Sequence, residues 1–470
     1  MDQPAIVLLM MPPVWCSLPP LGPAYLMGQL NRFGYKVIYY DFNLRCYGEM
    51  DSGWRKRWTL MTQTEAIEFG EDFRRHYGDD LDRLIRELAR QGTGYIGLTV
   101  FQQNEALSLY ISRRIKAIAP GIRIIWGGPQ IQYRLWQWSK SKSHPNIQPG
   151  DQKPEADPDP ARTEKSGHGR VSGYDPSLAG PIPPEYRVVD DWVVGEGEWA
   201  LLRILEGEKT GWHRIEVDSL DRMAFPDYSR FELKRYSRQR ALPVLFSRGC
   251  INRCRFCAES RLYGAYQYHD PDGLVDYLLH LKQVYHLHWI TFHDSMINGN
   301  LEALERLCRL MIRRKLDLHW DAQLGIRNDM ESGMVRLLKQ AGCFQVFVGL
   351  ESGSDRLLRT MGKPYTAEQA AHFLRMLRQT DLYAEISLIT DYPGETETDF
   401  FDTLQFIQTH RHAIPKIAQI NPFIALPGTE YYTSPSPPPR YDPLKISRLT
   451  ELARSCAIPY TSHYIQNLIR

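Results

Sequence analysis

The sequence lacks a hydrophobic run long enough to cross a membrane. Its first apolar stretch, Ile6 to Met11, has no basic residues before it and is interrupted at once by prolines. This stretch is too short for the apolar core of a signal peptide or for a membrane span. We therefore expect a cytoplasmic protein without a membrane-spanning segment.

The chain also lacks an excess of charge of one sign and lacks paired cysteines. Its 57 Lys and Arg residues nearly balance 55 Asp and Glu residues, which disfavours a general nucleic-acid binder. The eight cysteines show no paired spacing, so a disulfide framework is disfavoured and a reducing compartment is favoured. With 470 residues, 43% hydrophobic and 24% charged, the composition indicates a globular chain of about two to four domains.

What the sequence does have is a group of three cysteines on one short segment. Cys250, Cys254 and Cys257 follow an apolar run, residues 242–246, that predicts a buried strand. Gly249 ends this strand, so the cysteines are expected on the loop at its carboxyl end. Parallel α/β proteins place their chemistry at that end of a strand. Three thiols so close together, and odd in number, indicate a metal site.

Two kinds of metal site are compatible with three cysteines on one loop: a zinc site and an iron–sulfur cluster. Structural zinc usually takes four ligands from two pairs, and no second Cys-x2-Cys or His-x3-His pair follows here. A cubane iron–sulfur cluster has four iron corners, so three cysteines leave one iron open. An open coordination position is what makes a metal centre reactive, as in catalytic zinc. The alternative is a zinc loop completed by a distant ligand.

The spacing C-x3-C-x-aromatic-C, with Phe256 at the aromatic position, resembles the signature of the radical S-adenosylmethionine (SAM) superfamily. The resemblance implies that Cys250, Cys254 and Cys257 hold a [4Fe-4S] cluster. It also implies that the open iron binds the amino and carboxylate groups of SAM, with Phe256 in the same cofactor site.

Upstream of the cysteines, apolar runs alternate with amphipathic stretches. The expected strands are 5–11, 36–40, 95–100, 122–126 and 188–194, with helices between them. This alternation predicts a doubly wound parallel sheet, which binds ligands at the carboxyl ends of its strands. Thr99, Gly127 and Gly128 stand at two such ends, where glycines let a ligand approach the backbone. A Gly-Gly pair can also be only a turn.

Four motifs of this region resemble the cobalamin-binding subfamily of radical SAM enzymes. They are a proline-rich loop after the first strand, Tyr40-Asp-Phe-Asn43, Gly127-Gly128-Pro129 and Gly195-Glu-Gly-Glu198. The resemblance implies a Rossmann-like cobalamin-binding domain over residues 1–206. In it, Thr99 would contact the nucleotide tail of cobalamin, and Gly127 and Gly128 would make room for that tail.

One departure from that pattern concerns the cobalt ligand. Cobalamin domains often carry D-x-H-x-x-G after the first strand, and the His ligates cobalt. Here residues 11–22 contain no His. We therefore expect cobalamin to bind without a His ligand from this loop; the alternative is that the domain has lost cobalamin.

The remaining segments differ in composition. Residues 139–187 are rich in Ser, Lys, Pro, Asp and Gly and predict a disordered insertion. Residues 207–240 are expected to be a linker and 431–470 a short tail. Between them, 241–430 predicts six strand–helix units, and the resemblance implies a partial (β/α)6 TIM-like radical SAM barrel. The expected strands are 243–247, 289–293, 318–323, 344–349, 384–390 and 417–424.

Polar motifs recur at the ends of the barrel strands, where barrel catalysis is expected. Asp294, after the second strand, is the best candidate for a polar active-site contact. The resemblance implies that Glu351 and Ser352 meet the ribose or methionine end of SAM and that Ile389 flanks its adenine. Asp391 stands where the subfamily usually has Gly. Each acid taken alone is more often a cap of the helix that follows it than a ligand.

The resemblance as a whole implies an enzyme. An electron from a donor such as flavodoxin or ferredoxin would cleave SAM to a 5′-deoxyadenosyl radical, and methylcobalamin would methylate an unactivated carbon of a small-molecule, natural-product or peptide substrate. A cyclase or rearrangement enzyme with the same cofactors is the first alternative. A non-catalytic metal-binding interaction protein is the second. An RNA-modifying enzyme has no support in charge or in an appended domain.

Overall fold

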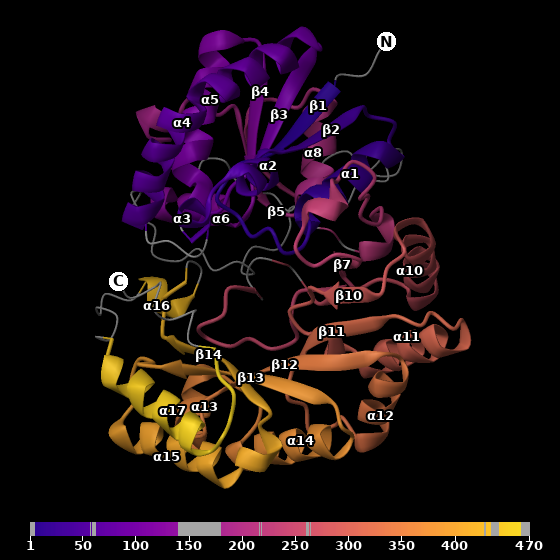
Figure 1. Cartoon of the computed structure of the whole chain (residues 1–470), viewed down its shortest axis with the longest axis vertical. Coiled ribbons are helices and arrows are strands. Elements are labelled where there is room, and N and C mark those ends of the chain that lie inside the picture. The colour runs from indigo at the N-terminus through magenta and orange to yellow at the C-terminus, as the bar shows by residue number, and fades with distance from the viewer. Residues whose placement is uncertain are drawn as a thin grey trace, which may run out of the picture. The chain divides into compact units, whose positions relative to one another are not determined.

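The computed structural model describes residues 5–56, 58, 63–139, 180–215, 217, 219–259, 263, 265–426, 429–433 and 441–461. The chain divides into two compact units, Met1–Gln239 and Arg240–Arg470. Each is described by itself below, with its elements labelled in Figure 1. Residues 140–179, most of the insertion expected at 139–187, lie outside the described residues.

The first unit is built on a sheet of six parallel strands in the order β2-β1-β3-β4-β5-β6. Its strands are β1 (Ala5–Met10), β2 (Val37–Asp41), β3 (Thr93–Thr99), β4 (Arg123–Gly127), β5 (Asp191–Gly195) and β6 (Gly211–Ile215). The apolar runs form strands because they are buried on both faces; Ile6 to Met10, for example, are all at most 4% exposed.

Helices cover both faces of this sheet, as Figure 1 shows. They are α1 (Leu21–Arg32), α2 (Phe42–Glu49), α3 (Ser52–Lys56), α4 (Gln63–Arg90), α5 (Glu105–Ile118), α6 (Pro129–Ser139) and α8 (Gly197–Leu205). Helix α1 packs on α8, and α4 packs on α5. The chain runs from β1 outward to β2 and then crosses back to β3, so the strand order reverses between β1 and β3. In such sheets the crevice at this point is where ligands bind.

The segment expected as a linker, 207–240, is instead part of the first unit. Within it, β6 is the edge strand of the sheet and pairs with β5 from Asp191 to Gly195. Tyr236 is buried and donates a hydrogen bond from its hydroxyl to Asp41. The first unit therefore extends to Gln239 rather than ending near residue 206.

The second unit contains a curved sheet of six parallel strands in the order β14-β13-β12-β11-β10-β7. They are β7 (Ala241–Val244), β10 (Trp289–Phe292), β11 (His319–Leu324), β12 (Cys343–Glu351), β13 (Tyr383–Thr390) and β14 (Lys416–Pro422). All six expected strands are confirmed. The first and last strands do not pair with each other, so the sheet is a partial barrel.

Helices lie along the outer face of this sheet (Figure 1). They are α10 (Pro271–Tyr285), α11 (Leu301–Arg313), α12 (Ser332–Gln340), α13 (Asp355–Met361), α14 (Ala367–Gln379), α15 (Glu397–Thr409) and α17 (Pro443–Ser455). A short α16 (Glu430–Thr433) precedes α17. A two-stranded antiparallel pair, β8 (Ser247–Arg248) with β9 (Gln267–Tyr268), follows β7.

The described part of the tail is integrated into this second unit. After α17, the Ile417 N–H donates to the Pro459 carbonyl at 2.9 Å and the Thr461 N–H donates to the Ile417 carbonyl at 3.2 Å. The tail therefore pairs with the outer edge of β14, which would otherwise be open to pairing with another chain.

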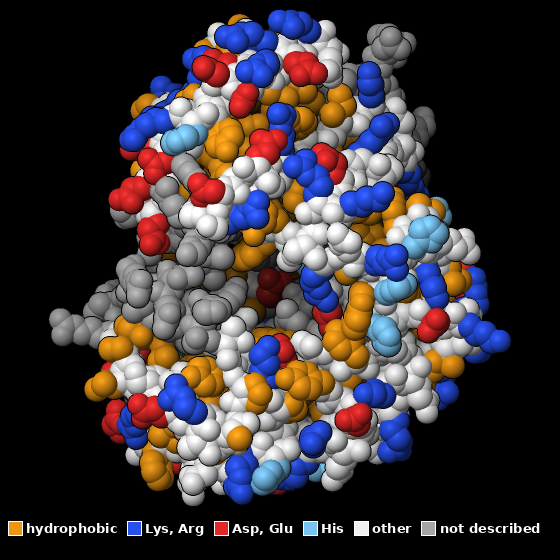
Figure 2. Space-filling model, viewed as in Figure 1, with side chains coloured by type: hydrophobic (Ala, Val, Ile, Leu, Met, Phe, Trp, Pro, Cys, Tyr) orange, Lys and Arg blue, Asp and Glu red, His pale blue; other side chains and the backbone are white. Residues whose placement is uncertain are grey.

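The surface fits the balanced charge of the sequence. On the face shown in Figure 2, Lys and Arg side chains are interspersed with Asp and Glu. In the part of the chain that the structure describes, no helix combines the length and the hydrophobicity that a membrane span needs.

Candidate functional site

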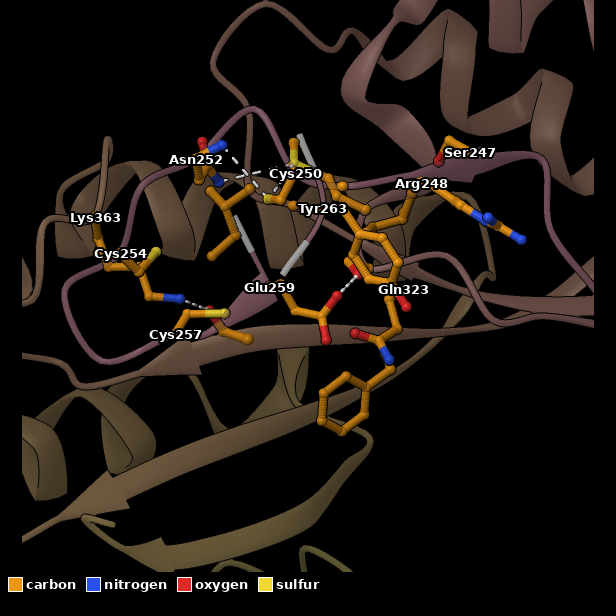
Figure 3. Close-up of a pocket in the computed structure, with 18 of the residues that line it drawn as sticks. Ser247, Arg248, Cys250, Asn252, Cys254, Cys257, Glu259, Tyr263, Gln323 and Lys363 are labelled. Carbon is orange, nitrogen blue, oxygen red and sulfur yellow. Dashed lines mark hydrogen bonds between the residues drawn. The ribbon is translucent and has the colours of Figure 1, made fainter. Parts of the chain in front are cut away.

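The three cysteines line one cavity of about 330 Å³ in the second unit. The cavity lies at the carboxyl ends of the barrel strands, and its other walls include Phe347 of β12 and Gln323 of β11. Figure 3 shows Cys254, Cys257 and Lys363 at one end of the view, Ser247 and Arg248 at the other, and Cys250, Tyr263 and Glu259 between them. The sequence prediction that these cysteines follow a strand end is confirmed.

Local structure fixes the path of the cysteine loop. Gly249 has φ +77°, a left-handed conformation that favours glycine, and turns the chain out of the β8 strand. Further along, the Arg255 N–H donates to the Met361 carbonyl of α13 at 2.9 Å, and the Cys257 N–H donates to the Cys254 carbonyl at 3.2 Å. The first bond ties the loop to α13 directly after Cys254, and the second closes a turn within the loop.

The chemistry of the three thiols suits a multi-iron group. Burial raises the pKa of Cys250 and Cys254, and that of Cys257 to about 12, so the thiolates need a positive metal centre to form. Nowhere in the described ranges do three His, Cys, Asp or Glu side chains stand close enough to hold a single metal ion. A cluster that takes one thiolate at each of three corners fits this arrangement better than one zinc ion does.

Glu351 forms a buried ion pair beside the cysteines. Its Oε1 lies 3.2 Å from Lys363 Nζ, and its Oε2 accepts a hydrogen bond from Ser387 Oγ at 3.0 Å. Lys363 Nζ also donates to the Gly349 carbonyl at 3.2 Å and lies 5.3 Å from the centre of the Phe256 ring. Burial alone would lower the pKa of Lys363, but nearby Tyr365, Glu351 and Cys254 raise it, so the ammonium stays charged.

Asp294 does not take the position that the sequence analysis gave it. Its side chain is fully buried and is not among the residues that line the cavity. The carboxylate accepts hydrogen bonds from the Phe246 N–H at 3.1 Å, from the Ser247 N–H and from Ser247 Oγ. The aspartate therefore braces the chain just before the cysteine loop, because its strand ends beside β7 with the side chain turned inward.

This brace predicts a pH dependence of stability. Burial raises the pKa of Asp294 to about 7, whereas in the unfolded chain it is near 3.8. Between these values only the folded state keeps the proton, so this group's contribution to stability is largest below pH 4 and is lost as the pH rises towards 7. We expect Asp294→Asn to remove up to about 4 kcal/mol of this pH dependence. Urea unfolding at several pH values measures the free energy of unfolding. If this free energy depended on pH in the same way in wild type and variant, the raised pKa of Asp294 would be refuted.

Ser352 also differs from its predicted role. Its hydroxyl lies 3.0 Å from Thr403 Oγ1 and accepts a hydrogen bond from the Ser354 N–H at 3.0 Å. It is 1% exposed and does not line the cavity. Ser352 therefore shapes the turn into α13 rather than facing the cavity.

Ile389 lies close to the cysteine loop through an apolar cluster. The cluster is built on Leu357, Met361 and Tyr392, with Phe256 and Ile389 packed against it. The Tyr392 ring stands perpendicular to the Phe256 ring, with the ring centres 6.1 Å apart. Phe256, the aromatic residue of the cysteine motif, and Ile389, the predicted neighbour of adenine, thus pack in one apolar cluster.

The loop after β13 contains an unusual backbone position. Asp391 has φ +57°, a conformation that costs a residue other than glycine about 1–2 kcal/mol. Its Oδ2 accepts from Thr390 Oγ1 at 3.1 Å, and its N–H donates to Glu395 Oε2 at 2.8 Å. These bonds, together with Lys445 of α17, keep the aspartate in a conformation suited to glycine. Thr396 caps α15, because its side chain accepts a hydrogen bond from the Asp399 N–H.

A second candidate site lies at the carboxyl edge of the first unit's sheet. Thr99 and Gly127 are paired across β3 and β4, and Gly128 follows with φ +103°. A Cβ on Gly128 would lie 2.7 Å from the Val100 carbonyl oxygen, whereas one on Gly127 would have an ordinary contact 3.7 Å from Val193. Gly128 is exposed on its other side. Bare backbone thus faces outward here, as close approach of a bulky ligand requires.

Two buried asparagines hold the loops around this edge: Asn43, the last residue of the Tyr40-Asp-Phe-Asn43 motif, and Asn104, to which the sequence analysis gave no role. Asn104 donates from Nδ2 to the Met11 carbonyl at 3.1 Å and to the Thr99 carbonyl at 3.2 Å, so it ties the end of β1 to the end of β3. Asn43 donates to the Val14 carbonyl at 3.1 Å and accepts from the Val14 N–H at 2.8 Å. Asn43 follows the end of β2 by two positions and Asn104 directly precedes α5, and these positions are the sequence signals that could have found them.

Glu259 is the main cavity residue that sequence reasoning missed. It follows Cys257 by two positions, and its carboxylate accepts a hydrogen bond from Ser295 Oγ at 2.5 Å. Both residues line the cavity, together with Tyr263 and Gln323. The proximity of Glu259 to the cysteines in sequence was a usable signal, whereas Gln323 lies on a strand far away in the chain.

Comparison with known proteins agrees with this geometry. Residues 244–407 match the model of the radical SAM superfamily. This chain carries a radical SAM domain. The matched range begins at the last residue of β7 and ends within α15, so it includes the cysteine loop and strands β10 to β13 but not β14 or the tail. The predicted superfamily and the partial barrel are confirmed.

Individual curated proteins and solved structures are also similar to this chain. An uncharacterized methyltransferase from Pyrococcus horikoshii is 26% identical over 194 residues, which cover 40% of this chain and 42% of that protein. The methyltransferase TsrM from Kitasatospora setae, solved with cobalamin and a [4Fe-4S] cluster, covers 89% of this chain and 75% of its own at 16% identity and a TM-score of 0.59.

A third relative matches nearly the whole chain in fold. The cobalamin-dependent SAM radical enzyme OxsB, solved with aqua-cobalamin and SAM, covers 97% of this chain and 56% of its own, at 16% identity and a TM-score of 0.60. At this identity the likeness shows the fold. The predicted order, a doubly wound sheet followed by a radical SAM barrel, is confirmed.

Proposed function

We propose that this protein is a cobalamin-dependent radical SAM methyltransferase that methylates an unactivated carbon of a small-molecule substrate. The observation that carries the proposal is the convergence of Cys250, Cys254 and Cys257 on one cavity of the radical SAM domain. The names of the Pyrococcus relative and of TsrM, both methyltransferases, support the reaction class.

The cavity residues have distinct tasks in this proposal. Cys250, Cys254 and Cys257 would hold a [4Fe-4S] cluster, one iron of which would remain for SAM. When bound, the cluster supplies the electron that cleaves SAM, and cobalamin supplies the methyl group. Glu351, held in place by Lys363 and Ser387, accepts hydrogen bonds from the polar end of SAM, and Phe256 packs beside it. Apolar walls such as Phe347 keep water away.

In the first unit, Thr99, Gly127 and Gly128 hold the nucleotide tail of cobalamin. No His from residues 11–22 ligates cobalt, because that segment has none. The proposed electron donor is flavodoxin or ferredoxin, and the proposed compartment is the cytoplasm, whose reducing conditions suit free cysteines. The interspersed surface charge supports a substrate other than nucleic acid.

Methyl transfer separates this proposal from a cyclase with the same cofactors. We expect the protein, reconstituted anaerobically with iron, sulfide and cobalamin and then reduced, to make trideuteromethylcobalamin from SAM that carries a deuterated methyl group. Mass spectrometry of the extracted cobalamin measures the label, and a reaction without protein is the control. Formation of 5′-deoxyadenosine without labelled cobalamin would favour the cyclase. Bound zinc with neither product would favour a non-catalytic protein.

A further inference from the structure

A buried ionic cluster links the C-terminal helix to the loop after β13. Lys445 of α17 lies 2.6 Å from Glu395 Oε2 and 3.5 Å from Asp391 Oδ1, and its side chain is 11% exposed. Both carboxylates are at most 5% exposed. A buried cation that serves two carboxylates leaves uncompensated charge when it is removed. Removal of Lys445 would therefore leave the two buried carboxylates of this turn without their cation.

The turn that Lys445 holds supports the cysteine loop directly. Tyr392 follows Asp391, and its ring packs against Phe256, which stands between Cys254 and Cys257. The other side of Tyr392 is fixed by Tyr431, whose hydroxyl lies 2.9 Å from the Tyr392 hydroxyl. Ile389 joins the same apolar cluster. Displacing the turn would therefore move the surface against which Phe256 rests.

We propose that Lys445 is a positioning residue for cofactor binding, which acts through the Asp391–Glu395 turn and Tyr392 on the cysteine loop. Lys445 lies outside residues 244–407, the range that matches the superfamily, so the tail contributes to the site that the domain forms. The functional part of this inference rests on the proposed binding of SAM. The structural part, coupling between Lys445 and the loop, can be tested without any cofactor.

Arg448 offers a matched control on the same helix. It lies 3.7 Å from Glu397 and stacks over Phe400 at 4.9 Å, the ring that Lys445 also approaches at 5.5 Å. No hydrogen bond or ion pair joins Arg448 to Asp391 or Glu395 among the described contacts. Arg448→Met thus removes a cation of α17 without touching the turn.

The first test is hydrogen–deuterium exchange of the cofactor-free protein. We expect Lys445→Met to speed amide exchange in peptides that span Cys254 to Cys257 by about tenfold, and Arg448→Met to leave it unchanged. Lys445→Arg should restore slow exchange because it keeps the charge. Wild-type exchange in Lys445→Met, or equal acceleration in Arg448→Met, would overturn the proposal. If Lys445→Met does not fold, Lys445→Met with Glu395→Gln, which removes the charges of Lys445 and Glu395 and keeps that of Asp391, is measured against the same two outcomes.

The second test measures SAM binding by the change that SAM causes in the electron paramagnetic resonance signal of the reduced, reconstituted cluster. We expect Lys445→Met to need about tenfold more SAM for the half-maximal change, with iron content and Arg448→Met as in wild type. An unchanged SAM requirement would overturn the functional part. If SAM did not change the resonance signal of the wild-type protein, the proposed function would be contradicted instead. The hydrogen–deuterium exchange experiment would still test the coupling between Lys445 and the cysteine loop.

Discussion

Replacing any one of Cys250, Cys254 and Cys257 by alanine is expected to reduce 5′-deoxyadenosine formation from SAM by more than about 100-fold, since even residues behind metal ligands cost 10–100-fold when they are lost. All three thiols line the same cavity, and burial raises the pKa of each, so none forms a thiolate readily without a metal. With one corner released, the cluster has two protein ligands and should not be retained.

Cys456→Ala is the matched control for these variants. Cys456 is also a partly exposed free cysteine, but it ends α17 and does not line the cavity. Iron and sulfide content after anaerobic reconstitution, together with 5′-deoxyadenosine yield, should match wild type in this variant. If the loop variants kept four irons per chain and full yield, the three cysteines would not be the cluster ligands.

Gly128→Ala is expected to lower the affinity for cobalamin by at least about tenfold and to reduce the free energy of unfolding by about 2–5 kcal/mol. The reason is geometric. The added Cβ would lie 2.7 Å from the Val100 carbonyl oxygen and 2.9 Å from the Val100 nitrogen, at a residue with φ +103°. Backbone atoms cannot move aside as a flexible side chain can, so the loop after β3 must shift.

Gly127→Ala provides the comparison within the same motif. Its Cβ would meet Val193 at an ordinary 3.7 Å, so the fold should tolerate it. Titration with hydroxocobalamin, followed by absorbance, measures affinity, and urea unfolding measures stability. Equal losses of stability in the two variants would contradict the geometric difference between Gly127 and Gly128. Loss of stability in Gly128→Ala with unchanged cobalamin affinity would remove this edge from the cobalamin site.

The sequence predicted what depends on local pattern. Buried apolar runs placed the strands of both sheets, and the spacing of three cysteines placed the metal loop, because these signals span fewer than about ten residues. Strand β6 was missed because Gly211-Trp-His-Arg-Ile is an edge strand with only two buried residues, His213 and Ile215, so it lacks a continuous apolar run.

The direction of individual side chains could not be read in the same way. Asp294 and Ser352 do stand at strand ends, but both turn inward to satisfy backbone groups of neighbouring segments. Lys445 could not have been found at all, since its partners Asp391 and Glu395 lie about fifty residues earlier in the chain. Such pairings are properties of the folded chain and leave no local pattern.

The central claim is that the fourth iron of the cluster is open and binds SAM. Electron–nuclear double resonance of the reduced, reconstituted protein tests it most directly, with SAM labelled by ¹⁵N in its amino group. The account predicts a ¹⁵N coupling from SAM to the cluster. A spectrum without that coupling, in which a protein side chain such as Glu259 is found on the fourth iron, would contradict it.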